Sequence, residues 1–505
     1  MKGVRIKMGF TTTTFLFIFL PILLAFYFVF YLKMRKSESV NKIGNFILII
    51  FSFIFYSWAL AITANILLLF SVIVWLLGLW IDCTRETELV VPVYRNGSRK
   101  EININISIIP LITGVVTTIW VLFHFKYFAT IAPLLSQYTY IDSNKYVSIT
   151  VPLGISFISF SVISYYADIY LKKASAGGFA DCLLYIFFFP KIISGPIVLW
   201  RDFQEQLKER EINTESFVDG INLVIIGFAK KVILADTFGA HADVLKGQYI
   251  DTPTAWFGWI LYALQIYYDF SGYSDVAIGV SKLFGFRIAN NFDFPYRSLS
   301  ITEFWRRWHI SLGNFFKNYI YFPLGGNRKG KSRTLSNLFI VFVVTGIWHG
   351  AGMAYIIWGT LHGICVVVER AIKEKRWYAK IPDFLKWGVT FFISASAWQF
   401  FRYGGNGISA FAALGQLLGI HGSYTSEDIL FPLRYYADNK VITLLVIGFM
   451  GATVLGDKRI LNLYENLKAN NLFYLLQELT LMLLFVISIS SMVSSNYNPF
   501  IYFQF

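Results

Sequence analysis

Two histidines, His309 and His349, are the residues of this chain best suited to chemistry. His309 follows the stretch FWRRW, and His349 lies in TGIWHGAG, within residues 335–368, which contain no Lys, Arg, Asp or Glu. Ionisable residues at membrane depth are costly and therefore mark functional candidates. Because an imidazole takes and returns a proton near neutral pH, the pair predicts acid–base chemistry.

Each histidine also has a plainer interpretation. His349 lies about 20 Å along its apolar run, near the middle of a bilayer, where a packing histidine bonded to a neighbouring helix is equally favoured. His309 has the setting of an interfacial belt of Trp and Arg. That belt explains the tryptophans but not the histidine, so we keep both residues as catalytic candidates.

The residues around these histidines are candidates for binding a substrate. On a helix Trp305 shares a face with His309, whereas Arg306 and Arg307 point elsewhere. Asp269 lies in the stretch YYDFSGYSD with Asp275, and Gly272 is a candidate helix break between them. Helix-packing acids paired with nearby Arg or hydroxyl groups are the favoured interpretation there, and without a His/Cys cluster we expect no metal. The predicted substrate-binding residues are Trp305, Arg306, Arg307, Asp269 and Trp348.

The elements that must position these residues are membrane helices. The chain has 505 residues, 56% hydrophobic and only 15% charged, whereas about a quarter of a soluble domain is charged. Residues 9–31, 43–81, 102–125, 335–368 and 480–505 lack charged side chains. These runs predict an all-α polytopic membrane protein with roughly 11–13 transmembrane helices, and 43–81 and 335–368 have room for two helices each. The first run is predicted to be a retained helix rather than a signal peptide.

The net charge of +14 is typical of Lys and Arg gathered in cytoplasmic loops. Four cations between Arg328 and Arg333 predict such a loop, with a phosphate-attracting rim for an anionic donor as the second interpretation. No polar stretch is long enough to fold alone, so we expect one membrane domain over residues 1–505, with the chemical motifs in about 150–370. Residues 265–335 mix charge with aromatic residues and predict either a folded-back core or an amphipathic surface segment.

Several motifs, in order, give this sequence a resemblance to a known family. They are PLGISF (152–157), FFP and SGPI (188–197), KKVILAD (230–236), residues 267–285, FWRRWHISL and YIYFPLGG within 302–326, TGIWHGAG (345–352), WGTLHG (358–363) and FIYFQF (500–505). Together they resemble the membrane-bound O-acyltransferase (MBOAT) family, in the branch that includes alginate O-acetylation proteins. The resemblance covers most of the chain and is weakest over 85–145 and 370–475.

The resemblance implies an acyltransferase shaped as a helical bowl with a central tunnel, located in the bacterial cell membrane. It implies transfer of acetyl from cytoplasmic acetyl-CoA toward an extracytoplasmic glycan, with an SGNH-type acetyltransferase partner and no tightly bound cofactor. The positive charge, interpreted as loops that contact anionic lipid, predicts no nucleic-acid partner. The essential histidine of the family maps onto His349 and a second histidine onto His309. The glycan stays open among alginate, peptidoglycan, cellulose and capsular polymers. Carrier-dependent D-alanyl transfer to teichoic acid is the alternative, and a transporter is a third.

Overall fold

The computed structural model describes residues 9–34, 40–95, 98–136, 151–248, 250–404, 407–420 and 431–494. The C-terminal motif at 500–505 and the basic residues at the extreme N-terminus lie outside these ranges. The chain divides into two compact units, which are described separately below: residues 1–217 with 281–288, and residues 218–280 with 289–505. The expectation of one membrane domain stays a prediction.

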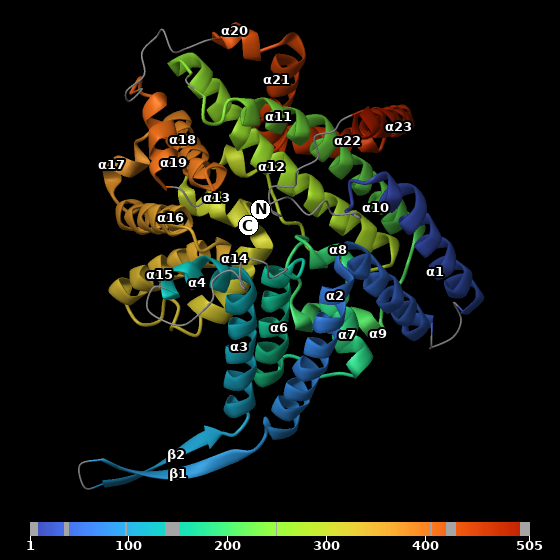
Figure 1. The fold of residues 1–505 in the computed structure, drawn as a ribbon, viewed down its shortest axis with the longest axis vertical. Helices are drawn as coiled ribbons and strands as arrows, with labels where there is room; N and C mark the ends of the chain where they lie inside the picture. The colour runs from blue at the N-terminus through green and yellow to red at the C-terminus, as the bar shows by residue number, and fades with distance from the viewer. Residues whose placement is uncertain are drawn as a thin grey trace. The chain divides into compact units, whose positions relative to one another are not determined.

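The first unit is built on long apolar helices with one β-hairpin. Helix α2 is continuous for 45 residues, and it contains two candidate membrane spans, Val40–Trp58 and Ala61–Thr84, in the run predicted to have room for two. Helices α2, α3 and α6 pack against one another, and the antiparallel β1–β2 hairpin extends from the ends of α2 and α3 (Figure 1). Its elements are η1 (Phe15–Phe19), α1 (Leu20–Met34), α2 (Val40–Thr84), β1 (Glu88–Arg95), β2 (Ser98–Asn105), α3 (Ile108–Leu122), η2 (Phe123–Tyr127), α4 (Phe128–Leu135), α6 (Ile155–Tyr170), α7 (Phe179–Phe187), α8 (Phe189–Ile192) and α9 (Trp200–Lys208).

The second unit holds the motifs that carry the candidate chemistry. It begins within α10 (Thr214–Phe228) and contains η3 (Ala229–Ala235), α11 (Asp236–Val244), most of α12 (Thr252–Leu283), η4 (Pro295–Arg297), α13 (Ile301–Arg307), α14 (Ile310–Phe316), η5 (Lys317–Tyr321), α15 (Lys331–His349), α16 (Met353–Ile372), α17 (Arg376–Ala379), α18 (Asp383–Arg402), α19 (Gly407–Gln416), α20 (Leu433–Tyr436), α21 (Asn439–Thr453), α22 (Lys458–Lys468) and α23 (Asn471–Ser494).

Most of the segment 265–316 is a folded core and not a surface helix, whereas residues 317–333 are mostly half-buried or exposed. Phe304, Trp308 and His309 in this segment are buried. The short helices α13 and α14 meet at a bend, and irregular backbone of this kind is tolerated at membrane depth when protein surrounds it. One expectation for this region is wrong. Gly272 does not break α12, because the missing side chain lets the helix continue against the backbone of Gly227 on α10; a Cβ on Gly272 would lie 2.7 Å from that carbonyl oxygen.

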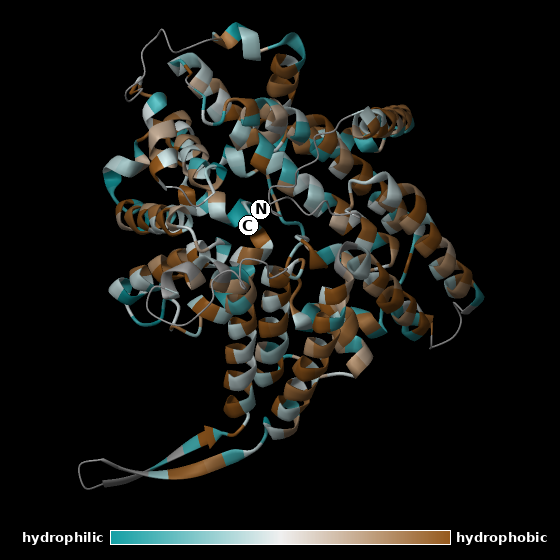
Figure 2. Cartoon of the chain, in the orientation of Figure 1, coloured by the Kyte–Doolittle hydropathy of each residue, from teal (hydrophilic) through white to brown (hydrophobic). Residues whose placement is uncertain are grey.

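The structure confirms an all-α polytopic protein. In the described residues six helical segments have the length and hydropathy of a membrane span, or seven if the bent pair α21–α22 forms one: Phe15–Lys33, Val40–Trp58, Ala61–Thr84, Ile108–Tyr127, Met353–Ile372 and Asn471–Ser494. Hydrophobic residues cover most of α1 and α23 (Figure 2), and large apolar side chains such as Val29 and Leu483 are exposed there, as lipid contact requires. The count is below the expected 11–13 because long helices such as α12 and α15 carry too many polar residues to meet the criterion.

Candidate active site

His349 is the last residue of α15 and is buried among aromatic rings. Its ring centroid lies 4.6 Å from that of Trp348, 5.1 Å from Trp358 on α16 and 4.9 Å from Phe401 on α18. The helix ends at this residue, and Gly350 continues in an extended conformation. The imidazole therefore stands at a helix end, where the backbone turns, in a largely apolar environment that strengthens electrostatic interactions.

Close packing of α15 on α16 places His349 there. A Cβ on Gly346 would lie 2.5 Å from the carbonyl oxygen of Tyr355, and one on Gly359 would lie 2.4 Å from that of Phe342. Only glycine allows the two backbones to approach this closely. The motifs TGIWHG and WGTLHG thus form the two faces of one helical hairpin, and this explains their glycines structurally.

His309 occupies the bend between α13 and α14. Its backbone has φ of 45°, an uncommon conformation for a residue with a side chain, and such strain is often kept at functional sites. The ring is buried, meets Phe270 edge-to-face at 4.7 Å, and its Nδ1 lies 3.1 Å from Oδ1 of Asn291. The seven-residue helices on either side are too short to span a bilayer. Burial lowers the pKa of His309 to about 3, so the ring is neutral at physiological pH.

A line of tryptophans connects the surroundings of the two histidines. Trp308, next to His309, contacts Trp398 with 4.6 Å between centroids; Trp398 contacts Trp358 at 5.7 Å, and Trp358 contacts His349. The three tryptophans belong to one buried hydrophobic cluster. The structure therefore brings the two predicted histidines into the same aromatic core, from opposite ends of this line.

Trp305 contacts a third histidine, His362, to which the sequence analysis assigns no role. The indole N–H of Trp305 donates to Nδ1 of His362 over 3.2 Å, and both rings pack on Trp358. Because Nδ1 accepts this bond, the hydrogen of neutral His362 is on Nε2. Trp305 thus orients the imidazole of His362. The contact of Trp305 with substrate stays a prediction.

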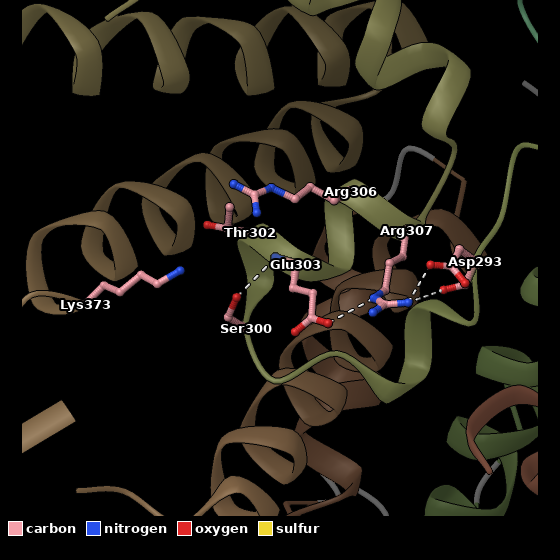
Figure 3. A pocket seen from close by; sticks show the side chains of 7 residues that line it. All are labelled: Asp293, Ser300, Thr302, Glu303, Arg306, Arg307 and Lys373. Atoms are coloured by element: carbon pink, nitrogen blue, oxygen red, sulfur yellow. Dashed lines mark hydrogen bonds and ion pairs between the residues drawn. The ribbon is translucent and has the colours of Figure 1, made fainter. Parts of the chain in front are cut away.

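Arg306 and Arg307 have different surroundings although they are adjacent. Arg307 pairs with Glu303 at 3.0 Å and with Asp293 at 2.6 Å. Arg306 is exposed, and within the described part of the chain it has no ion-pair partner. It lines a cavity of about 370 Å³ and extends, like Lys373, toward the space beside Thr302 (Figure 3). The lining residues are Asp293, Ser300, Thr302, Glu303, Arg306, Arg307 and Lys373.

Helix α13 is fixed at this cavity by its N-terminal contacts. The hydroxyl of Ser300 accepts from the backbone N–H of Glu303 over 3.1 Å, and the carboxylate of Glu369 on α16 accepts from the N–H of Thr302 over 3.1 Å. Both acceptors satisfy N–H groups that a helix leaves open at its start. As a result Arg306 projects from an anchored helix rather than from a loose loop.

Asp269 is buried in a charged cluster with Lys231 and Asp236. Lys231 Nζ lies 2.9 Å from Asp269 and also forms a close ion pair with Asp236. Asp275 pairs separately with Lys230 at 2.6 Å. The interpretation of Asp269 and Asp275 as helix-packing acids is supported, with lysines from KKVILAD in place of Arg or hydroxyl groups. A role for Asp269 or for the buried Trp348 in binding substrate stays a prediction.

Two of the buried polar residues here, Asn291 and His362, were missed at the sequence level. Asn291 is a neutral residue 18 positions before His309, and spacing alone gives it no signal. His362 did carry a signal, because it is a further imidazole in an uncharged run and lies in one of the quoted motifs.

The second unit thus holds buried histidines at helix breaks, and a cavity beside α13 that is lined by three cations and two carboxylates. The profile of the membrane-bound O-acyltransferase family matches residues 170–406. The chain is 37% identical over 400 residues to a probable alginate O-acetylase of Pseudomonas aeruginosa, an alignment that covers 78% of this chain and 72% of that protein. The chain belongs to the MBOAT family.

Two further relatives carry different names. A peptidoglycan O-acetyltransferase of Helicobacter pylori is 34% identical over 369 residues, 66% of this chain and 69% of the relative. A teichoic acid D-alanyltransferase of Streptococcus thermophilus is 31% identical over 277 residues, 51% of this chain and 66% of the relative. The family and the relatives that align over most of the chain identify an enzyme of the O-acetyltransferase class and a multi-pass membrane protein.

Proposed function

We propose that this protein transfers acetyl from cytoplasmic acetyl-CoA across the bacterial cell membrane toward a hydroxyl of an extracytoplasmic polysaccharide. The observation that carries the proposal is the buried imidazole of His349 at the end of α15, within an aromatic core. The relatives named for alginate and peptidoglycan acetylation support a glycan as the acceptor. An SGNH-type acetyltransferase outside the membrane is the partner that we expect to complete the transfer.

In the proposed mechanism His349 acts as the general base. It takes the proton of the acceptor hydroxyl while the hydroxyl oxygen attacks the thioester carbonyl. The intermediate then collapses, the C–S bond breaks, and the thiolate of coenzyme A leaves and takes up the proton held by His349. The apolar rings around His349 exclude water, which would otherwise hydrolyse the thioester. His309 contacts the acceptor or the developing oxyanion.

The cations in the cavity beside α13 favour an anionic acyl donor such as acetyl-CoA. Two carboxylates neutralise Arg307, so Arg306 and Lys373 are the cations that can attract the phosphates of coenzyme A. The cations between Arg328 and Arg333 are a second candidate for this attraction. Neither set requires a metal or a bound cofactor.

The test compares cell-surface ester acetate in cells that lack the protein, in cells with the wild type and in cells with His349→Ala. We expect the variant to lose on the order of 10²–10⁴ in acetylation rate, the usual size of acid–base catalysis. The amount of each protein in the membrane is the control for insertion. Normal acetylation by a well-inserted His349→Ala variant would contradict the proposal.

A covalent route through an acetyl-histidine is a variant of the same function. Brief incubation of the purified protein with acetyl-CoA labelled in its acetyl group separates the two routes. Label that stays on the wild-type protein and is absent from His349→Ala indicates the covalent route, and no label on either indicates direct transfer.

The D-alanyltransferase relative supports a second candidate, in which the donor is a thioester on a carrier protein. Copurification with a phosphopantetheine carrier and no turnover of free acetyl-CoA would favour it. The smaller share of the chain that this relative matches makes acetyl transfer the better supported function.

A further inference from the structure

The environment of Asn291 determines which nitrogen of His309 holds the ring hydrogen. Its side-chain oxygen is identified by a backbone group: the N–H of Ser311 points at this atom over 3.2 Å, and because a backbone N–H can only donate, the atom must be an oxygen. The hydroxyl of Ser311 donates to the same oxygen over 2.9 Å, and the amide nitrogen of Asn291 faces the Ser274 hydroxyl at 3.3 Å. The orientation of the amide group is therefore fixed.

That same oxygen lies 3.1 Å from Nδ1 of His309. An amide oxygen only accepts, so Nδ1 must carry the hydrogen and donate it. In the neutral ring Nε2 then has the lone pair and can accept a hydrogen bond, but it cannot donate one. Protonation would add a donor at Nε2, but burial lowers the pKa of His309 to about 3 and disfavours that form.

Asn291 also supports the strained backbone that presents this ring. The carbonyl oxygen of Asn291 accepts from the N–H of Ile310 over 3.0 Å, and its side-chain oxygen accepts from Ser311, so one residue serves both N–H groups that open α14. The side chain of His309, at the capping position, makes no capping bond. One buried residue thus fixes both the backbone and the ring of His309.

We propose that Asn291 is a positioning residue that holds the hydrogen of His309 on Nδ1, so that Nε2 accepts a hydrogen bond from the acyl acceptor. Of the two contacts considered above for His309, this selects the acceptor and excludes the oxyanion, which needs a donor. His349 takes the proton of the attacking hydroxyl, so the group that donates to His309 is a second one on the acceptor. An acceptor with a second hydroxyl or an amide N–H, in addition to the hydroxyl that is acylated, has this chemistry. The assignment of the acceptor rests on the proposed function, whereas the tautomer rests on the hydrogen bonds alone.

The direct test is nitrogen NMR of the full-length protein in lipid, with ¹⁵N-labelled histidine and with the His309 signals assigned by their loss in His309→Gln. We expect the wild type to show the hydrogen on Nδ1, and Asn291→Leu to show a changed or mixed tautomer. Asn291→Asp keeps an acceptor at this place and is expected to keep the hydrogen on Nδ1. A wild-type hydrogen on Nε2 would overturn the proposal without any assay of acetylation.

Kinetics distinguish positioning from a purely structural role. We expect Asn291→Leu to lower kcat/KM roughly 10–100-fold, the usual size for removal of a partner that orients a histidine, with KM for acetyl-CoA unchanged. In Asn291→Asp the new carboxylate favours the imidazolium, so the acid limb of the pH–rate profile should move to higher pH. Ser274→Ala removes the contact of the Asn291 amide nitrogen and leaves the contacts of its oxygen in place; this variant is the matched control and should keep the acid limb of the wild type. An unmoved limb in Asn291→Asp, with its activity retained, contradicts a role for Asn291 through His309.

If the tautomer is as expected but no acetyl transfer to glycan occurs, the proposed function fails and the positioning role of Asn291 survives.

Discussion

At the scale of single residues, His309 and His362 differ in the hydrogen-bond character of their Nε2 atoms. His309 donates through Nδ1 to Asn291, whereas His362 accepts at Nδ1 from the indole of Trp305. In their neutral forms, Nε2 of His309 is an acceptor and Nε2 of His362 is a donor. Acyl transfer uses both kinds of group, because a hydroxyl must be oriented and an oxyanion must be stabilised. The hydrogen-bond partner of each imidazole therefore determines whether its Nε2 can donate or accept.

The two adjacent arginines allow a matched test of the cavity proposed to bind acetyl-CoA. Arg306→Met removes a cation that faces the cavity, and we expect KM for acetyl-CoA to rise about tenfold, which corresponds to roughly 1.4 kcal/mol. Arg307→Met instead leaves Glu303 and Asp293 without their common partner, so its main effect should be a lower temperature of unfolding. Initial rates over a range of acetyl-CoA concentrations and thermal unfolding in detergent measure the two effects. Equal changes of KM in both variants would contradict a particular role for Arg306 in binding acetyl-CoA.

The sequence predicts the ionisable residues of this site but not their neutral partners. His349 is conspicuous because no charged residue lies in the run around it, and His309 is conspicuous because a belt of Trp and Arg does not account for a histidine. Asn291 is 18 positions from the ring it holds, and Trp305 is 57 positions from His362, so the pairings exist only once the chain has folded. The environment of Asp269 is the intermediate case: a paired acid was expected, but not Lys231 as its partner.

At the scale of elements, the hairpin of α15 and α16 determines where His349 lies. The charge-free run 335–368 predicted two helices, and the structure confirms them. What the run did not show is that α15 ends at His349 itself, because hydropathy is continuous across the break at residues 350–352. The glycines that allow the close approach are visible in the sequence, but their contacts are with backbone atoms of the opposite helix.

Gly346→Ala tests this hairpin. The added Cβ would lie 2.5 Å from the carbonyl oxygen of Tyr355, so the helices must separate. We expect a loss of about 1–3 kcal/mol in the free energy of unfolding, as for overpacked cores, together with reduced acetylation because His349 moves with its helix. Gly388→Ala on α18 is the control, since a Cβ there meets nothing within 4 Å and alanine favours a helix. Thermal unfolding and acetylation of both variants give the comparison, and a Gly346→Ala protein as stable as Gly388→Ala would show that the contact is not limiting.

At the scale of the whole molecule, hydropathy predicts the class of protein better than the number of its spans. The most apolar helices, such as those over 61–84 and 471–494, are easily recognised, and exposed apolar side chains cover them. Helices that form the chemical core carry buried polar residues, for example Gln265 and Asp269 on α12, and so fall below the same criterion. A count from sequence therefore depends on how these polar helices are treated, and the functional core is the part of a membrane enzyme where hydropathy is least informative.

If the cations before α15 attract acetyl-CoA, this basic segment must lie on the cytoplasmic side, because acetyl-CoA is made in the cytoplasm. Lys331, at the start of α15, has an almost fully exposed side chain (94%), so a cysteine placed there reports which side it faces. In a protein whose Cys83, Cys182 and Cys365 are replaced by alanine, we expect Lys331→Cys to react with a membrane-impermeant maleimide in inside-out vesicles but not in intact cells. Permeabilised cells show that the cysteine is reactive, and the alanine-substituted parent shows the background. Labelling in intact cells would place this loop outside, where acetyl-CoA is absent; the donor would then have to be a different thioester or to enter from the opposite face of the fold.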